Sequence, residues 1–248
     1  MSFEINLKNS VALVTGAKAG IGAEIALHLA KAGADVVICG SSPVERAEKT
    51  LNKIKECGVR AIYKQVDLSV EGNGTKLVQD VIEEMGKIDI VVNNAALATP
   101  DWNKALHINV AAPLEIIEEA AKDMEKRNYG RIVNITSSSV ASGGTPLPQY
   151  VSTKGACDAM GRFLAKRYAP KGILINTVAP GPVLTDMVLQ RYSEEEFTEH
   201  YIKQMPINRC LVPEDIAGSV LFLCSSLCSG VCGQTILCDG GRVTLGIK

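Results

Sequence analysis

Two side chains that can move a proton lie four residues apart in the sequence. Tyr150 and Lys154 follow Pro148, and a helix beginning near that proline places both on one face. Reduction of a carbonyl group needs a proton donor at its oxygen, but a phenol with a pKa of about 10 is poorly suited to that task near neutral pH. A nearby ammonium group favours the phenolate and lowers this pKa. The pair therefore predicts a general acid and base, with Tyr150 donating a proton in reduction and accepting one in oxidation.

A glycine-rich segment, residues 15–22, supplies a second and independent signal. It lies between a short apolar run and a helical pattern, where Gly16, Gly20 and Gly22 would let a diphosphate approach the backbone. The N-terminus of the following helix would offer its unpaired N–H groups to that diphosphate. Because glycines between a strand and a helix are typical of nucleotide sites, this turn, which includes Lys18 and Ile21, predicts one.

The rest of the chain alternates short apolar runs with amphipathic helical patterns, the longest of them at residues 102–127 and 150–168. Strands that are apolar throughout are covered on both faces, and their regular alternation with helices implies right-handed crossovers. The sequence therefore predicts a doubly wound α/β fold of the Rossmann type, with one parallel sheet in a single domain spanning residues 1–248. Its seven strands are expected at residues 11–14, 36–39, 61–66, 88–92, 131–135, 174–178 and 235–237.

One segment breaks this alternation. Residues 185–210 contain three consecutive glutamates and few apolar positions, which predicts a mobile helical flap over the site.

Composition excludes several classes of function. The chain has 248 residues, with 26 Lys and Arg against 27 Asp and Glu, so it lacks the basic field that nucleic acid binding requires. It has neither a basic, apolar leader nor 18 consecutive apolar residues, so neither a signal peptide nor a membrane span is expected. A small-molecule ligand is favoured instead.

The eight cysteines include no CxxC pair, which favours free thiols in a reducing, cytoplasmic compartment. Cys224, Cys228 and Cys232 have helical spacing but no histidine close by, so we expect buried thiols and no metal site. His28, His107 and His200 are expected at the surface.

The glycine spacing GxxxGxG after Thr15 resembles that of the short-chain dehydrogenase/reductase family. Further motifs follow in the family's order and cover nearly the whole chain. They are Asp67-Leu68, the segment Asn93-Asn94-Ala95-Ala96 with Ala96 where the family has Gly, the tetrad Asn109, Ser137, Tyr150 and Lys154, the segment Pro180-Gly181 with Val183 and Thr185, and Asp239-Gly240-Gly241.

The resemblance implies roles for these residues. Ser137 would donate a hydrogen bond to the substrate oxygen, Lys154 would also hold the nicotinamide ribose, and Asn109 would bind a water that relays protons. The choice of Ser137 rests on the family's usual 13-residue separation from Tyr150, and Ser138 is the alternative. The cofactor would be held by the glycine turn, Asp67, Leu68, Asn93, Ala95, Tyr150, Lys154, Pro180, Gly181, Val183 and Thr185.

The end of the second strand bears on the choice of dinucleotide. An acidic residue there would bind the ribose of NAD and repel the extra phosphate of NADP, but this chain has Gly40 followed by Ser41 and Ser42. Two hydroxyl groups with Lys18 nearby favour NADP(H). The family's NADP enzymes usually carry Arg or Lys where this chain has Ala19 or Ser41, so NAD(H) stays open. The two serines could also simply cap the next helix.

The sequence says less about the substrate than about the cofactor. Only seven residues separate Asn94 from Trp102, about a dozen fewer than is common in the family, so one wall of the pocket is trimmed. The remaining candidate lining, residues 97–99, 143–147 and 184–205, is mostly apolar and has no Arg cluster, which favours a carbonyl compound with an apolar or neutral body.

Resemblance is closest to the 3-oxoacyl-carrier-protein reductase-like and carbonyl reductase-like members of the family. It implies an NADPH-dependent ketone reductase, with a 3-oxoacyl thioester as the first substrate to test. The alternatives are an NAD-dependent alcohol, sugar or steroid dehydrogenase and a nucleotide-binding sensor without turnover. Family members are usually tetramers or dimers, so a homotetramer or homodimer is expected.

Overall fold

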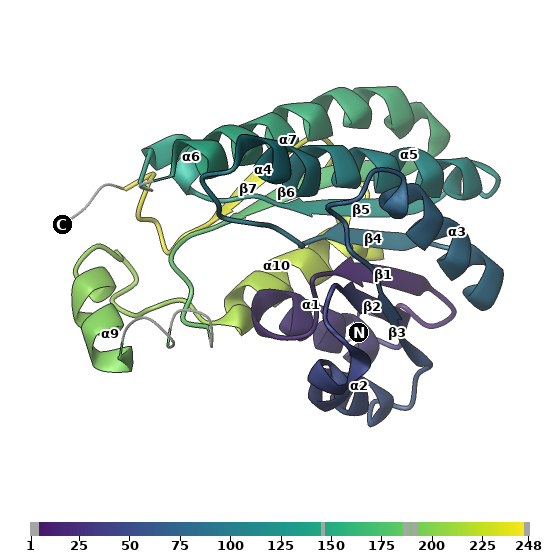
Figure 1. The fold of residues 1–248 in the computed structure, drawn as a ribbon, viewed down its shortest axis with the longest axis horizontal. Coiled ribbons are helices and arrows are strands. Elements are labelled where there is room, and N and C mark those ends of the chain that lie inside the picture. The colour runs from purple at the N-terminus through teal and green to yellow at the C-terminus, as the bar shows by residue number, and fades with distance from the viewer. Residues whose placement is uncertain (1–4, 145–146, 186–188, 190–192, 246–248) are drawn as a thin grey trace.

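The computed structural model describes residues 5–144, 147–185, 189 and 193–245. A seven-stranded parallel sheet in the order β3-β2-β1-β4-β5-β6-β7 forms its centre and confirms the predicted doubly wound fold (Figure 1). The strands are β1 (Val11–Thr15), β2 (Asp35–Gly40), β3 (Ala61–Gln65), β4 (Ile90–Asn93), β5 (Gly130–Ile135), β6 (Ile173–Pro180) and β7 (Thr235–Cys238).

Helices cover both faces of the sheet, as Figure 1 shows. The helices are α1 (Gly20–Lys31), α2 (Glu48–Lys55), α3 (Asn73–Met85), α4 (Trp102–Leu106), α5 (Ala112–Glu125), α6 (Ser139–Ser142), α7 (Pro148–Tyr168), α9 (Glu194–Ile202) and α10 (Pro213–Cys224), with short turns η1 (Val44–Arg46), η2 (His107–Ala111), η3 (Ala169–Lys171) and η4 (Ser226–Cys228). Ile25 and Val220 belong to the apolar core on the face of α1, α2 and α10, and Ile117 and Leu164 belong to the core on the face of α3, α5 and α7.

The uniformly apolar strands are buried on both sides, as their sequence predicts. In β1, Ala12 and Val14 join the core under α1 and α10, whereas Val11 and Leu13 join the core under α3 and α5. Both layers of helices are therefore needed to remove this strand from water.

The single long helix predicted for residues 102–127 is interrupted. Between α4 and α5 lies η2, a π-helical turn in which the backbone N–H of Ala112 bonds to the carbonyl of His107. Such turns add a residue to the helix and are frequent at functional sites. Asn109 lies inside this turn, so the irregular backbone belongs to the candidate site.

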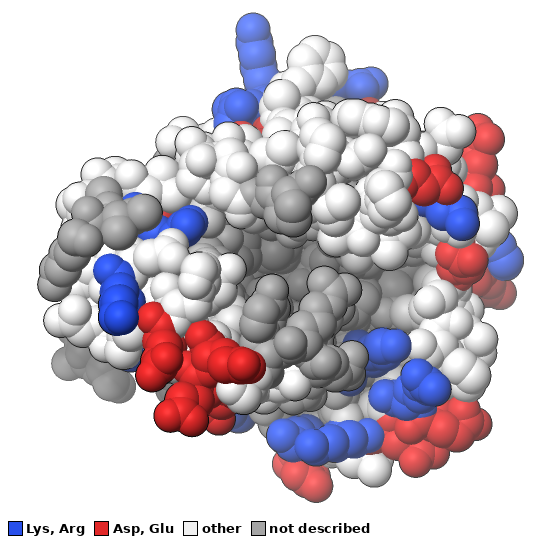
Figure 2. All heavy atoms as spheres, turned by 60° about the vertical axis from the view of Figure 1, so that its left-hand side comes forward, with Lys and Arg blue, Asp and Glu red and all other residues white. Residues whose placement is uncertain are grey.

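The expected flap contains one described helix, α9, whose first turn carries the exposed Glu194, Glu195 and Glu196. Figure 2 shows acidic side chains gathered on this side of the molecule, beside a hollow. Met205 and Leu211, which follow α9, are buried in the core under α1 and α10. Residues 186–188 and 190–192 of the flap, and 145–146 of the expected pocket lining, lie outside the described residues, and the flap's mobility stays a prediction.

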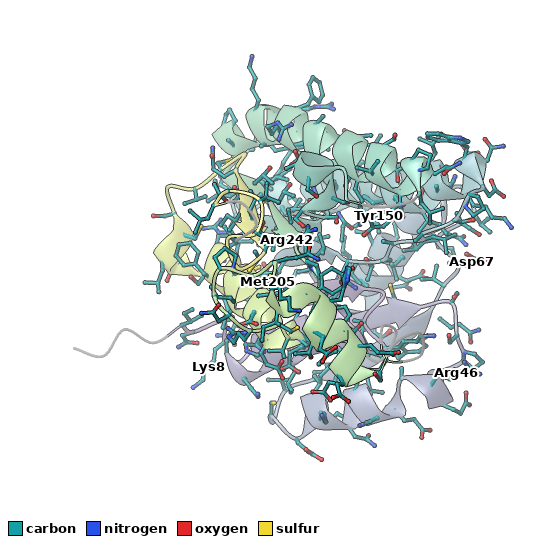
Figure 3. The ribbon with its side chains drawn as sticks, turned by 90° about the vertical axis from the view of Figure 1, so that its left-hand side faces the viewer. Lys8, Arg46, Asp67, Tyr150, Met205 and Arg242 are labelled. Carbon is teal, nitrogen blue, oxygen red and sulfur yellow. The ribbon has the colours of Figure 1, made fainter. Side chains whose placement is uncertain are left out.

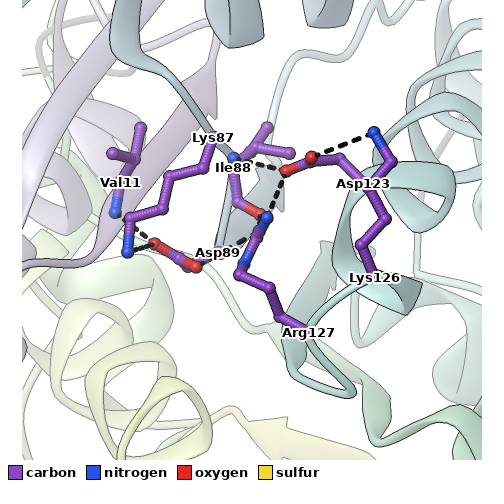
Figure 4. A network of polar contacts seen from close by, with 7 residues as sticks. All are labelled: Val11, Lys87, Ile88, Asp89, Asp123, Lys126 and Arg127. Atoms are coloured by element: carbon purple, nitrogen blue, oxygen red, sulfur yellow. Dashed lines mark hydrogen bonds and ion pairs between the residues drawn. The ribbon is translucent and has the colours of Figure 1, made fainter.

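A network of buried charges fixes the amino ends of two central strands (Figure 4). The Asp89 carboxylate accepts a hydrogen bond of 2.9 Å from the backbone of Val11, and Asp123 accepts one of 3.1 Å from Ile88. Arg127 pairs with both carboxylates, at 3.4 and 2.8 Å. Because buried charges are tolerated only when paired, the network stabilises the start of β1 and β4 and leaves the opposite, carboxyl edge of the sheet free for a site.

No helix in the described ranges has both the length and the apolar character needed to cross a bilayer.

Candidate active site

The candidate residues gather at the carboxyl edge of the sheet. Thr15 ends β1, Asn93 ends β4, Pro180 ends β6, and Ser137 follows β5 by two residues. The strand order reverses between β1 and β4, and the crevice at such a reversal is where open α/β sheets bind ligands. The fold thus brings together motifs that are spread along 170 residues, from Thr15 to Thr185.

The glycine turn needs its glycines for two reasons. Gly16 and Gly20 have left-handed backbones, with φ of 64° and 62°, a region that side chains disfavour. A Cβ on Gly16 would lie 2.8 Å from the Cα of Ala95, whereas above Gly20 the space is open as far as Thr185, at 3.8 Å. The turn is therefore packed against the segment that follows β4 on one side and accessible on the other.

The N-terminus of α1 faces this accessible side without a partner of its own. Its N-cap residue, Ala19, makes no side-chain capping bond, and the first turn carries no acidic residue. The unpaired N–H groups and the positive end of the helix dipole fit a diphosphate. Ile21 offers only its backbone, because its side chain packs against the core.

Two residues that belong to the recognised motifs, but that received no role in the sequence analysis, hold the turn to the sheet. The Thr15 hydroxyl accepts hydrogen bonds from the backbones of Asn94 and Ala95, at 3.0 and 2.9 Å. The Asn94 amide in return donates to the carbonyls of Thr15 and Gly16, at 2.8 and 3.1 Å. The predicted Asn93 instead buries its side chain between strands, donating to Asn134, so its amide does not reach the turn.

We expect Gly22→Ala to lower stability by about 1–3 kcal/mol, because it overfills this contact. A Cβ at Gly22 would lie 2.4 Å from the Asn94 amide nitrogen and 2.9 Å from the Gly16 carbonyl. Urea unfolding of the variant checks the expectation. Gly218→Ala in α10 is the matched control, since nothing lies within 4 Å of its added Cβ and it should be neutral or stabilising. Equal stability of Gly22→Ala and wild type would contradict the proposed packing.

Tyr150 and Lys154 share one face of α7, as predicted. Lys154 is only 3% exposed, its ammonium donates a 2.7 Å hydrogen bond to the carbonyl of Ile135, and it lies 5.8 Å from the centre of the Tyr150 ring. The Ser137 side chain lies close enough to the Tyr150 hydroxyl to act on the pKa of the phenol. These three side chains form one group at the end of β5.

Ser137, and not Ser138, is the serine of this group. Its hydroxyl oxygen accepts hydrogen bonds from the hydroxyl of Ser139, at 2.8 Å, and from the Ser139 backbone, at 3.2 Å. With both acceptor positions used, its own proton remains available for donation. Ser138 is buried, and its backbone N–H donates to the carbonyl of Pro180. Ser139 is a residue that sequence reasoning missed.

Asn109 is a clamp between two segments. Its carbonyl oxygen accepts from the backbone of Leu97 at 2.8 Å, and its amide donates to the Leu97 carbonyl at 3.0 Å and to Thr153 at 2.9 Å. Both amide hydrogens are therefore engaged by protein. The side chain thus ties the shortened 95–101 segment to α7, and the water-relay role of Asn109 stays a prediction.

Burial sets the protonation of the acid–base pair. It lowers the pKa of Lys154 to about 8. It also raises the pKa of Tyr150 above its ordinary value, although the Ser137 hydrogen bond acts in the opposite direction. The expectation that Lys154 lowers the Tyr150 pKa is wrong for this structure, since the ammonium bonds to a carbonyl and does not reach the phenol oxygen. Tyr150 is thus protonated at neutral pH.

The Tyr63 side chain, on β3, supports the loop after β2. The phenol hydroxyl of Tyr63 lies 2.5 Å from the Ser42 carbonyl and 3.0 Å from the Gly40 carbonyl. Lys18 reaches across from the glycine turn and donates to the Ser42 hydroxyl at 2.9 Å. The alternative that the serines cap the next helix is wrong, because η1 begins after Pro43 without a side-chain cap.

The remaining predicted residues lie on loops that follow β3 and β6. Asp67 accepts a 2.9 Å hydrogen bond from the backbone of Ser69, which holds its pKa below the usual range, and Leu68 beside it is buried. The backbone N–H of Gly181 donates to the carbonyl of Cys238, and Val183 forms a β-bridge with Leu211. With the backbone held in this way, the Thr185 side chain lies over Gly20.

Two histidines are less exposed than expected. His28 and His107 are both half-buried, and the Nε2 of His107 has no hydrogen-bond partner among the described residues. His28 bonds to the carbonyl of Glu24, and His200 is exposed. Within the described part of the chain, no group of three His, Cys, Asp or Glu side chains is arranged to hold a metal ion.

Known proteins resemble the chain along its whole length. The profile of a family described as enoyl-(acyl carrier protein) reductase matches residues 16–242. A 3-oxoacyl-[acyl-carrier-protein] reductase of Aquifex aeolicus (strain VF5) is 36% identical, covering 96% of this chain and 99% of that protein. The 7alpha-hydroxysteroid dehydrogenase of Escherichia coli (strain K12) is 34% identical, covering 98% and 97%.

A solved structure agrees with these relatives. A 3-oxoacyl (acyl-carrier-protein) reductase from Agrobacterium tumefaciens C58, with NADP bound, has a TM-score of 0.90 and 32% identity, covering 95% of each chain. In the present structure, the open side of Gly20 and the uncapped α1 fit a dinucleotide diphosphate. The chain belongs to the short-chain dehydrogenase/reductase family of NAD(P)-dependent oxidoreductases, which act on CH–OH groups.

Proposed function

We propose that this protein is an NADP(H)-dependent oxidoreductase that interconverts a ketone and a secondary alcohol, working as a carbonyl or 3-oxoacyl thioester reductase. The observation that carries the proposal is the placement of Ser137, Tyr150 and the buried Lys154 together at the carboxyl edge of the sheet. The similarity to two 3-oxoacyl-carrier-protein reductases supports the thioester as substrate.

The cofactor would be held by the glycine turn, by Asp67 and Leu68, by Ala95 and by the segment from Pro180 to Thr185, with Tyr150 and Lys154 at its nicotinamide end. When bound, the nicotinamide supplies or accepts the hydride. The protein's own contribution is to place donors at the substrate oxygen, where negative charge develops.

In this proposal both Ser137 and Tyr150 donate to the substrate oxygen. The Ser137 hydroxyl, positioned by Ser139, donates a hydrogen bond to the carbonyl oxygen, and the Tyr150 phenol donates the proton that completes the alcohol. Lys154 keeps a positive charge beside the resulting phenolate. Asn109 holds the opposite wall in place by fixing Leu97 to α7.

The preference for NADP(H) rests on the loop after β2. A Cβ on Gly40 would lie 3.2 Å from the Tyr63 hydroxyl, so an acidic side chain at that position would displace the phenol from the Ser42 carbonyl. Three lysines, Lys18, Lys49 and Lys53, and one carboxylate, Glu24, line a cavity of about 310 Å³ beside the glycine turn, so its lining carries a net positive charge. Figure 2 shows blue side chains gathered below the hollow, on the side of α2. These charges favour a 2′-phosphate.

Dissociation constants for NADPH and NADH, measured by nucleotide fluorescence, test the cofactor assignment without any substrate. We expect wild type to prefer NADPH by about tenfold or more. Gly40→Asp alone should weaken both nucleotides, whereas Gly40→Asp combined with Tyr63→Phe, which removes the obstructing oxygen, should favour NADH. Equal affinity of wild type for the two nucleotides would contradict the assignment.

The raised pKa of Tyr150 gives a pH dependence with a definite sign. Reduction needs the protonated phenol and the charged form of Lys154. We therefore expect kcat/KM to stay level through neutral pH, to decline as Lys154 loses its proton at a pKa of about 8, and to fall about tenfold per pH unit above the pKa of Tyr150. Oxidation needs the phenolate and should rise over the same range. Profiles in both directions measure this, and a reduction rate that climbs from neutral to alkaline pH would argue against Tyr150 as the acid.

We also propose a homotetramer or homodimer in the cytoplasm. The edge strand β7 is incompletely covered, and Phe163 on α7 and Phe222 on α10 are 68% and 38% exposed, which supports an apolar contact between subunits. All eight cysteines are free thiols, which supports a reducing compartment. Sedimentation at micromolar concentration measures the oligomeric state.

A further inference from the structure

An arginine from the far end of the chain lies at the same edge of the sheet as Tyr150. Arg242 follows the last residue of β7, Cys238, by four positions, and carboxyl ends of parallel strands share one edge. In Figure 3 its label lies between α9 and the helix that carries Tyr150. The sequence segments expected to line the pocket contain no Arg cluster, and Arg242 lies outside all of them.

The backbone of Arg242 is fixed by a buried carboxylate. Asp239 is 2% exposed and accepts hydrogen bonds from the backbones of Gly241, at 2.9 Å, and Val243, at 2.8 Å. A Cβ on Gly181 would lie 2.9 Å from the Cα of Asp239, so the loop is packed directly on the end of β6. The arginine is thus held beside the segment that begins at Pro180.

The side chain is oriented as well. Its Nε donates a 3.0 Å hydrogen bond to the side-chain oxygen of Gln204. The side-chain amide of Gln204 in turn donates to the backbone carbonyl of His200 in α9. Both terminal nitrogens lie 3.7 Å from the position of a Cβ on Gly144, at the start of the loop that leads into α7 and Tyr150. The guanidinium therefore spans from the end of the flap helix to the loop before the candidate acid.

The two terminal nitrogens of the Arg242 guanidinium could bind both oxygens of one oxyanion. Among the described residues, neither terminal nitrogen has a hydrogen-bond acceptor and no carboxylate lies within 4.0 Å. Arg209 shows the contrast within the same chain, because its two terminal nitrogens bind both oxygens of Asp215 at 2.7 Å. A planar fork with both nitrogens free is the geometry that carboxylates and phosphates take.

We propose that Arg242 is a binding subsite for an oxyanion carried by the substrate, a carboxylate or a phosphate remote from the reacting carbon. The inference deepens the proposed function and rests on it. It replaces the neutral-bodied substrate that the apolar segments suggest with an anionic ketone or alcohol, bound by Arg242 at one end and by Ser137 and Tyr150 at the other. Gln204 is then a positioning residue for Arg242.

Matched pairs of substrates test this subsite. Acetoacetate and levulinate are each compared with their methyl esters, and acetoacetyl-pantetheine is compared with and without its terminal phosphate, which separates the two sources of the oxyanion. In wild type, we expect the anionic member of at least one pair to have a KM about tenfold lower than its neutral partner. Arg242→Gln should remove that difference and leave the KM of the neutral member and the affinity for NADPH unchanged.

Three further variants separate this contact from general charge. Arg242→Lys keeps the charge without the fork and should retain only part of the preference. Gln204→Leu removes the orienting bond and should weaken the preference less than Arg242→Gln does. Lys203→Gln, which removes an exposed charge next to Gln204, should leave it intact.

Failure of this inference is distinguishable from failure of the proposed function. If neutral ketones are reduced but no pair shows a preference in wild type, or if the preference survives in Arg242→Gln, the subsite is wrong and the oxidoreductase stands. If no ketone is reduced, the melting temperature of the NADPH complex is measured with the corresponding hydroxy acids and hydroxy esters. Stabilisation of wild type, but not of Arg242→Gln, by the acids alone supports the subsite, and equal shifts overturn it.

Discussion

Replacing Tyr150 with phenylalanine should lower kcat for ketone reduction by about 100-fold or more, while changing the affinity for NADPH by no more than about twofold. The ring and its packing on α7 are kept, and only the hydroxyl beside Ser137 is removed. Without it, no described side chain of this group can give a proton to the substrate oxygen, since Ser137 would leave an unstable alkoxide and the ammonium of Lys154 is bonded to Ile135.

The matched control is Tyr168→Phe, which removes one hydroxyl from the same helix at its other end, where it bonds to Glu118. Its turnover should match wild type. Steady-state kinetics and nucleotide titration on both variants give the comparison. If Tyr150→Phe kept more than about a tenth of wild-type turnover, the phenol would not be the proton donor.

Lys154→Met should reduce both nucleotide affinity and turnover, by about tenfold and about 100-fold respectively. Lys154 is buried and carries a charge with a pKa near 8, so its removal takes away a cation that the group keeps next to Tyr150. Methionine has a similar shape, but it leaves the Ile135 carbonyl without its donor, at a cost to stability of about 1–3 kcal/mol.

Melting temperatures therefore accompany the kinetics, so that lost activity is not confused with lost folding. Lys166→Met, an exposed position on the same helix, serves as the control and should behave as wild type. Unchanged affinity of Lys154→Met for NADPH would rule out a contact between Lys154 and the nucleotide.

The fold could be predicted from the sequence because its signals are local. Every predicted strand is present, with ends within two residues of those expected. A short run of apolar residues between turn signals is typical of a buried strand in an α/β protein. The glycine turn could also be predicted, because the left-handed backbone at Gly16 and Gly20 favours glycine at both positions.

The finer parts of the site depend on contacts between distant segments, which spacing does not encode. Asn94 and not Asn93 holds the glycine turn, because the strand's pleat directs one side chain toward Thr15 and the other toward Asn134. Tyr63 supports the loop at Ser42 from a neighbouring strand. The pKa of Tyr150 is raised because burial outweighs its hydrogen bond, which the helix spacing alone could not show.

The measurement that tests the central claim most directly is transfer of deuterium from NADPH labelled at the reactive carbon of its nicotinamide. The enzyme is mixed with the labelled nucleotide and a panel containing a 3-oxoacyl thioester, an oxo acid, its ester and a cyclic ketone, and the products are analysed by mass spectrometry. We predict that at least one alcohol carries a single deuterium at its carbinol carbon, and that Tyr150→Phe slows its formation. Tight binding of NADPH without deuterium in any product would contradict an oxidoreductase and point to a nucleotide-binding sensor.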